Sequence, residues 1–207
     1  MTRGPLAPSD RDRAAHATFL TQPNTGLVRL LPRQIAESSF YRKPPVKING
    51  GGAYYSFAYR SHEYGSGSDL ELGPPVFNGG AEHYYLSVGF AGADFGMLTN
   101  LGETPLETLT VNDSRAEFLR TYKPPQRESE ARRESRRFHP GVTIDGVRYI
   151  GHLPVQVGAT YLLRSINYDT SDVLVAFRVV RQDKDESLII AWKMLKQFGR
   201  PTLHRSR

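Results

Sequence analysis

The chain of 207 residues contains no cysteine. This absence excludes disulfides, thiolate nucleophiles, cysteine-bound zinc and iron–sulfur clusters. It leaves the cellular compartment open, because a chain without thiols tolerates either redox environment. Tryptophan is almost as scarce, with Trp192 as the single copy. This residue shares an apolar strand face with Leu188, Ile190 and Met194, so we expect it to be buried.

Long hydrophobic runs are also missing. No segment reaches the roughly 20 apolar residues of a membrane-spanning helix, so no span is expected. Residues 1–19 lack the apolar centre of an export signal, while a signal removed before Met1 stays an open alternative. Neither charge dominates: 27 lysines and arginines against 21 acidic residues give a formal net charge of +6. This modest basic excess favours acidic partners without singling out nucleic acid.

Glycine and aromatic residues are abundant between Gly50 and Gly102. Glycines at this density mark bends and close approaches of the backbone, and aromatic side chains fill or line β-structure. From 53 to 60 the side chains alternate, which predicts a half-buried strand. The residues expected on its buried face are Ala53, Tyr55, Phe57 and Tyr59. Alternation at 69–72 and 83–90 predicts further antiparallel strands.

Residues 112–139 change from strand to helix periodicity. Asn112 or Asp113 can cap a short helix over 114–121, which the prolines at 124 and 125 end. The segment RESEARRESRR at 127–137 places glutamates three or four residues before arginines, and such pairs stabilise a helix. It has almost no apolar face, so we expect an exposed, charged helical excursion.

The chain then returns to strands. Asp145-Gly146 between two β runs predicts a two-residue hairpin, because this turn requires positive φ at both positions. Longer strands are expected at 161–168, 173–181 and 187–195, with 182–186 as a charged hairpin loop. The strand at 173–181 is apolar on both faces, which is typical of a strand at the centre of a sandwich or beneath a helix.

These patterns predict a mainly β fold with antiparallel sheets, sandwich- or barrel-like, and one or two short helices inserted around residues 112–139. We expect a single β-rich domain over 26–198. Residues 1–25 form a flexible or partner-bound arm, and residues 199–207 a basic tail. Stretches such as GGGAYYSF resemble bacterial β-proteins in general and point to no particular family.

Polar side chains within the aromatic stretch offer a candidate ligand pocket. The predicted pocket residues are Tyr55, His62, Tyr64, His83, Tyr85 and Asp94. Adjacent His62 and Glu63 point to opposite faces of a strand, so we expect no metal there. Residues 65–69 lack the Lys-Ser/Thr ending of a nucleotide loop, and residues 169–172 offer too few oxygens for Ca²⁺. The sequence therefore predicts no metal, no cofactor and no catalytic residue.

The charged helix offers a candidate basic surface. Its arginines are Arg127, Arg132, Arg133, Arg136 and Arg137. Three interleaved glutamates reduce the net field, and the aromatic residues of a single-strand binding groove lie elsewhere in the sequence. Nucleic acid is therefore not the favoured partner.

Three hypotheses follow. The leading one is a non-catalytic binding or assembly subunit that contacts other protein subunits, including copies of itself, through its arms and excursion. The first alternative is a ligand-binding or hydrolytic β protein that uses the aromatic and histidine pocket. The second is a nucleic-acid-binding protein that uses the arginine helix and the basic tails.

Overall fold

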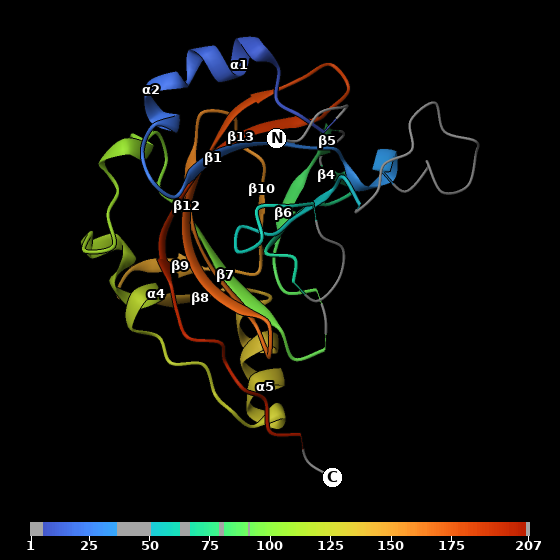
Figure 1. The fold of residues 1–207 in the computed structure, drawn as a ribbon. Coiled ribbons are helices and arrows are strands. Elements are labelled where there is room, and N and C mark those ends of the chain that lie inside the picture. Colours follow the sequence, from blue (N-terminus) through green and yellow to red (C-terminus); the bar gives the residue numbers. More distant parts are fainter. Residues whose placement is uncertain (1–5, 37–50, 63–66, 79–80, 91, 206–207) are drawn as a thin grey trace.

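The computed structural model describes residues 6–36, 51–62, 67–78, 81–90 and 92–205. Its regular structure is mainly antiparallel β-sheet with a few short helices, as Figure 1 shows. The prediction of a mainly β, antiparallel fold is therefore confirmed. Among the described residues, no helix is long and apolar enough to cross a membrane.

The largest sheet has five strands in the order β1-β13-β12-β11-β7. Their bounds are β1 (Thr25–Leu30), β13 (Leu188–Gln197), β12 (Ser171–Gln182), β11 (Thr160–Asn167) and β7 (Phe95–Asn100). Each neighbouring pair is antiparallel, and β12 changes register against β13 at two irregularities. Such irregularities increase the local bend and twist of a strand. The strands expected after residue 160 all occur, as does the charged turn between β12 and β13.

Strand β12 lies at the centre of this sheet and carries an apolar core on each face. Its odd-numbered residues from Val173 to Val179 join one buried cluster, while Leu174 and Ala176 join another. Side chains alternate along a strand, and each face of β12 is covered by another layer, so both faces are buried from solvent. The prediction of a central strand apolar on both sides is confirmed.

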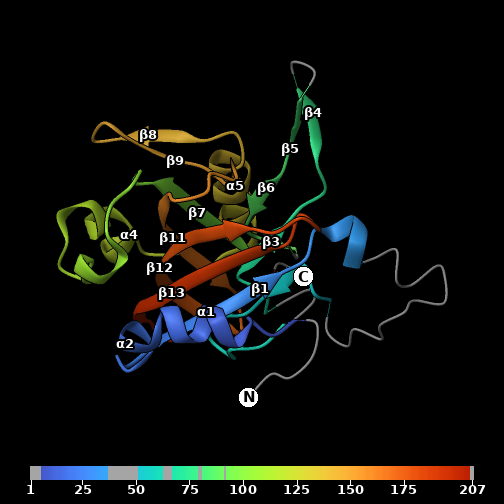
Figure 2. The same cartoon turned by 90° about the horizontal axis from the view of Figure 1, so that it is seen from above.

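A smaller sheet covers the first face. It has the order β10-β6-β3-β2, formed by β10 (His152–Pro154), β6 (Tyr85–Ser87), β3 (Leu70–Leu72) and β2 (Tyr54–Tyr55). Leucines from β3 and β6 pack here with Tyr161 and Phe177 of the large sheet. The hairpin of β4 (Val76–Asn78) and β5 (Ala81–His83) projects away from this layer in Figure 2.

Helices and a second hairpin cover the opposite face. The elements are η1 (Leu106–Thr108), η2 (Ser114–Ala116), α4 (Glu117–Thr121), α5 (Glu128–Phe138), β8 (Val142–Ile144) and β9 (Val147–Tyr149). The turn between β8 and β9 has positive φ at Asp145 and Gly146, which confirms the predicted hairpin. The short helix expected over 114–121 is also present, with Asp113 accepting a hydrogen bond from the Arg115 N–H.

Helix α5 is not the exposed excursion that its sequence predicts. Ala131 and Phe138 are fully buried, and they share one side of the helix because they lie seven residues apart. The Phe138 ring stacks on Phe95 of β7 at 6.1 Å between centroids. Glu134 accepts a hydrogen bond of 2.8 Å from the Tyr122 hydroxyl. Two buried apolar residues and one part-buried hydrogen bond thus hold α5 on the sheet.

Residues 6–25 do not form the predicted arm either. They fold into α1 (Asp10–Ala15) and α2 (Ala17–Leu20), and Phe19 enters the core on the helix-covered face. Ser9 and Asp12 cap α1 reciprocally, and Asp12 also pairs with Arg181 of β12 at 2.5 Å. These contacts fix the segment to its own domain. Residues 1–5 of the predicted arm lie outside the described residues.

The C-terminal segment also packs on its own domain. The His204 N–H donates to the carbonyl of Gln126 at 2.7 Å, and Asp169 N–H donates to the carbonyl of Pro201 at 2.8 Å. Residues 201–204 thus run between the start of α5 and the turn before β12. Backbone hydrogen bonds, which composition does not reveal, hold this part of the predicted basic tail in place.

The strand predicted over 53–60 is shorter than expected. Only Tyr54–Tyr55 is β-strand, and the chain then turns because the buried Asp69 carboxylate accepts the Phe57 N–H at 2.7 Å. Phe57 is fully buried as predicted, whereas Tyr59 is 53% exposed, so the prediction for Tyr59 is wrong. Asp69 ends the alternation, and a side-chain cap of this kind is not visible in the periodicity.

Candidate functional site

Tyr55 and His62 of the predicted pocket are in contact. Their rings meet at 5.4 Å, and Tyr55 also contacts Phe57 and the buried Trp192. His62 Nε2 lies 2.9 Å from the carbonyl oxygen of Arg29. Burial raises the pKa of Tyr55 to about 12 and lowers the pKa of His62. Both side chains are therefore neutral at physiological pH and are packed where the two sheets meet.

The other predicted pocket residues lie apart from this pair. Tyr85 is half-buried on β6, and its ring lies 6.0 Å from that of His152. His83 is exposed on β5. Tyr64 lies outside the described residues. The structure therefore brings Tyr55 and His62 together, and the ligand-binding role proposed for the whole set stays a prediction.

Asp94, the last of the predicted pocket residues, lies in the wall of an open cavity of about 570 Å³. The described lining of this cavity is Gly92, Ala93, Asp94, Glu128, Arg132, Tyr168, Asp169, Thr170, Leu203 and Arg205. It contains none of the other predicted pocket residues. The cavity is bounded by the segment before β7, the turn before β12, the first turn of α5 and the C-terminal segment.

The cavity holds two aspartates in different settings. Asp94 is 8% exposed, and its Oδ1 accepts the Tyr168 N–H at 2.8 Å. Burial raises the pKa of Asp94 to about 6, and the charge of Asp169 adds to the effect. Asp169 has a φ of 59°, and its Oδ1 accepts the Leu203 N–H at 3.4 Å.

Helix α5 exposes its arginines more than its glutamates. Its exposed side chains are Ser129, Arg132, Arg133, Arg136 and Arg137, which we call the arginine face. The glutamates of the helix are half-buried. Arg132 pairs with Glu128 at 2.6 Å and Arg137 with Glu134 at 3.1 Å. Arg133 and Arg136 form no ion pair with any described residue.

Arg127, the remaining arginine of the predicted basic surface, precedes the helix as its N-cap residue and is exposed. The structure thus brings together all five predicted arginines on one element. The sequence shows glutamates interleaved with arginines, whereas the structure leaves the glutamates half-buried and the arginines exposed. This difference in exposure follows from Ala131 and Phe138, whose burial fixes the rotation of the helix.

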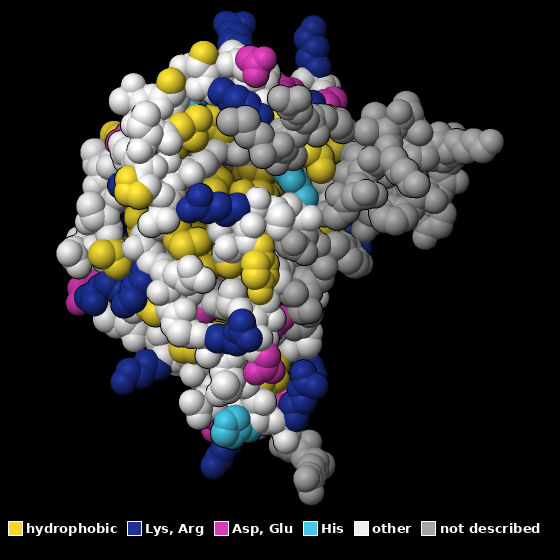
Figure 3. All heavy atoms as spheres, viewed as in Figure 1, with side chains coloured by type: hydrophobic (Ala, Val, Ile, Leu, Met, Phe, Trp, Pro, Cys, Tyr) yellow, Lys and Arg dark blue, Asp and Glu magenta, His cyan; other side chains and the backbone are white. Residues whose placement is uncertain are grey.

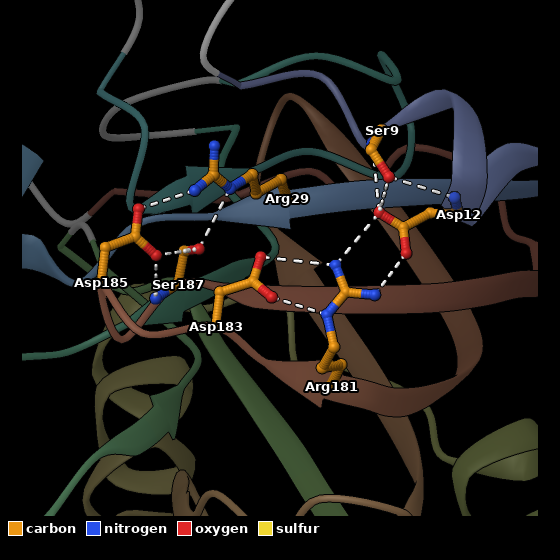
Figure 4. Close-up of polar contacts among 7 residues, drawn as sticks. All are labelled: Ser9, Asp12, Arg29, Arg181, Asp183, Asp185 and Ser187. Atoms are coloured by element: carbon orange, nitrogen blue, oxygen red, sulfur yellow. Dashed lines mark hydrogen bonds and ion pairs between the residues drawn. The ribbon is translucent and has the colours of Figure 1, made fainter.

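On one face of the molecule the positive charge is dispersed. In the face drawn in Figure 3, lysine and arginine side chains stand at separate points around a shallow hollow of hydrophobic side chains. Two of the arginines on the large sheet are engaged in a polar network at the β12–β13 turn, shown in Figure 4. Arg181 joins Asp12 to Asp183, and Arg29 binds Asp185 and Ser187.

This network has a structural role. Arg181 links the cap of α1 to the β12–β13 turn, because its Nη1 lies 2.5 Å from Asp12 and its Nε 2.6 Å from Asp183. Hydrogen bonding to Arg181 lowers the pKa of Asp12 to about 2. The sequence separation of 169 residues between Asp12 and Arg181 explains why local patterns did not predict the pair.

A fully buried ion pair lies between the large sheet and α4. Arg164 of β11 binds Asp172 of β12 through two nitrogens, at 2.5 and 2.7 Å. Its third nitrogen donates to the Leu119 carbonyl, and its guanidinium stacks over the ring of Phe198 at 3.4 Å. Each of the three guanidinium nitrogens of Arg164 has a partner, so we assign this group a structural role between neighbouring layers.

Comparison of the chain with known protein families, curated proteins and solved structures finds no match. A functional assignment therefore depends on the geometry of the arginine face and of the Asp94 cavity.

Proposed function

We propose that this protein is a non-catalytic binding or assembly subunit whose arginine face docks on an acidic protein surface. The observation that carries the proposal is the difference in exposure between the arginines and the glutamates of α5. Arg133 and Arg136 are exposed without an ion pair to the described residues, while the glutamates are half-buried. The surface that a partner meets is therefore more basic than the amino-acid composition of the helix alone would indicate.

The rigidity of this helix supports the proposal. Phe138 and Ala131 are buried against the sheet, so docking does not have to order the helix first. Glu128 and Glu134 hold Arg132 and Arg137 in fixed positions. Arginine is enriched in protein interfaces because its planar guanidinium binds carboxylates through two parallel hydrogen bonds.

A protein partner is favoured over nucleic acid. Two of the four arginines on the face are already paired with glutamates, which weakens the long-range field that attracts a polyanion. Phe138 of the helix and Phe95 beneath it are buried and not available for stacking on bases. Tyr122 is half-buried, and its hydroxyl is bound to Glu134. Carboxylates of a protein partner need only short-range contact, so the exposed arginines of the helix can pair with them directly.

Site-specific photo-crosslinking tests the proposal. A photoreactive amino acid replaces Ser129, which is exposed on the arginine face, and in a matched control it replaces Thr143, which is exposed on β8. In the host cell, we expect Ser129 to give one discrete protein adduct that Thr143 does not give. The double variant Arg133→Glu/Arg136→Glu should abolish that adduct.

Two outcomes contradict the proposal. An adduct with nucleic acid at Ser129 favours the nucleic-acid alternative, since the same face then serves a polyanion. A protein adduct that persists after charge reversal shows that the arginines do not hold the partner. Neither substituted side chain is buried, so we expect the double variant to fold as the wild type does. Far-ultraviolet circular dichroism checks this expectation.

A further inference from the structure

Two histidines from different elements meet where α5 ends. His139 is the C-cap residue of the helix, and His152 is the first residue of β10. Their ring centroids lie 5.1 Å apart, with 46° between the ring planes. The β8–β9 hairpin separates them in the sequence, so their spacing along the chain gives no sign of the pair.

Backbone contacts fix this close approach. The Phe138 carbonyl accepts the Gly151 N–H at 2.8 Å, which joins the residues that directly precede the two histidines. The Gly151 carbonyl accepts the Val88 N–H at 3.0 Å, next to the end of β6. A Cβ at position 151 would lie 3.3 Å from the Cα of His139, so a glycine permits the approach. The backbone therefore holds the two rings close together before any ligand binds.

His152 carries a buried nitrogen that lacks a partner. Its Nδ1 forms no hydrogen bond with any described residue. Burial and the neighbouring His139 lower the pKa of His152, so the ring is neutral at physiological pH and keeps a lone pair for coordination. The Tyr85 ring lies 6.0 Å from that of His152 and restricts its rotation. A buried polar atom without a partner is costly, and a bound cation would supply that partner.

The ring separation matches two imidazoles on one tetrahedral ion. With zinc–nitrogen bonds of about 2.0–2.1 Å, two such rings have centroids about 5 Å apart. Adjacent positions of a square-planar ion would bring the centroids to about 4.5 Å. Histidine nitrogen is a common zinc ligand, whereas Mg²⁺ and Ca²⁺ prefer oxygen. The observed 5.1 Å therefore favours Zn²⁺.

The electrostatic setting allows a cation at this place. The C-terminal end of α5 carries the negative end of the helix dipole, which favours positive charge. Arg137 is paired with Glu134, and Arg136 is exposed, so solvent screens its charge. His139 is also exposed, which gives an ion access from solvent.

We propose that His139 and His152 together bind one Zn²⁺ ion. The pair supplies two ligands and water supplies the others, because the described residues contain no group of three or more histidine or acidic side chains suited to a metal. The bound ion links the end of α5 to the small sheet. This site is separate from the docking function of the arginine face. Substitution of the histidines leaves the arginines unchanged, so each proposal can fail without the other.

Calorimetric titration of the untagged chain with zinc sulfate at pH 7.5 tests the site. We expect saturable binding of one ion per chain, and no binding of Mg²⁺. His139→Asn and His152→Asn should each weaken the affinity by roughly tenfold or more, because a single imidazole remains. His204→Asn is the matched control, since His204 is exposed and lies beside the start of α5, at the other end of the helix. This variant should bind zinc as the wild type does.

Thermal melts give a second readout. Zinc should raise the melting temperature of the wild type, because it binds the folded state, and EDTA should reverse the shift. His139→Asn replaces an exposed side chain, so it should melt as the wild type does without zinc and show no shift with it. Long-range ¹⁵N spectra of the wild type need no variant, and zinc should shift the ring nitrogens of His139 and His152. The proposal is overturned by the absence of saturable binding, by equal zinc affinities of His139→Asn and His204→Asn, or by shifts confined to other histidines.

Discussion

Replacing Asp172 by asparagine is expected to destabilise the protein strongly, because it leaves the guanidinium of Arg164 buried without its counter-charge. Arg164 is 1% exposed and is bound to Asp172 through two nitrogens. Removal of one partner from a buried ion pair costs about 3–5 kcal/mol, since the remaining charge is not solvated. Asp172→Asn should therefore lower the free energy of unfolding by that amount.

The double variant Arg164→Met/Asp172→Leu should be more stable than either single variant. It removes both buried charges and fills the space with apolar groups, a change that is often close to neutral in other proteins. Here the Leu119 carbonyl also loses its donor, which costs about 1–3 kcal/mol. We expect the double variant to fall below the wild type by no more than that.

Urea denaturation of the wild type, both single variants and the double variant gives the four free energies of this cycle. Arg120→Met is the control, because the Arg120–Glu117 pair is exposed, with a separation of 4.0 Å, and is worth at most about 0.5 kcal/mol. If the losses of the two single variants simply add in the double variant, the buried pair is not a coupled unit and the reasoning is refuted.

Three further predictions concern the packing and the acid–base behaviour. Gly26→Ala should destabilise the protein by about 1–3 kcal/mol, since a Cβ would lie 2.6 Å from the ring of Trp192; Gly199→Ala has open space and should be neutral in the same thermal melts. Phe138→Ala should cost about 3–5 kcal/mol and make the arginines of α5 the first trypsin cleavage sites. The isolated wild-type chain should resist cleavage there, and early cutting in α5 would show that the helix is not held on the sheet. Protonation of Asp94 should raise the free energy of unfolding by about 1 kcal/mol as the pH falls from 8 to 5. The reason is that Asp94, with a pKa of about 6 in the folded state, binds the proton more tightly there than in the unfolded chain. Asp94→Asn should remove this rise in denaturation curves, and an identical pH dependence in both proteins would contradict it.

The β part of the fold could be predicted because it depends on local signals. Alternation and turn residues locate β11, β12 and β13, and Asp145-Gly146 locates the β8–β9 hairpin. The apolar residues on both faces of β12 also predict its central position. The burial of Trp192, at 2% exposure, follows from the same alternation and is confirmed.

The failures have a common physical cause in contacts between distant segments. Residues 6–25 of the predicted arm pack on the domain, where Asp12 forms an ion pair with Arg181 far along the chain. The predicted strand after Tyr55 ends because the Asp69 carboxylate caps the turn. Helix α5 was expected to protrude because Ala131 and Phe138 form too narrow an apolar stripe to weigh against its arginines. The seven-residue spacing of those two residues was the available signal.

The candidate sites could be predicted only in part. Composition identified the arginines of α5, but the rotation of the helix, which leaves its glutamates half-buried, depends on packing. Asp94 was singled out beside histidines with which it shares no described cavity. Its neighbours there, Asp169 and Leu203, come from segments far away in the sequence, so spacing carried no information about them.

The mass of the native particle tests the central claim most directly. The protein is isolated from its host at low salt, and its mass is measured by sedimentation before and after the addition of salt to 1 M. We predict a particle heavier than the 23.2 kDa chain that dissociates in high salt and does not form with Arg133→Glu/Arg136→Glu. A monomer at low salt, or a heavy particle that is unaffected by this charge reversal, would contradict the account.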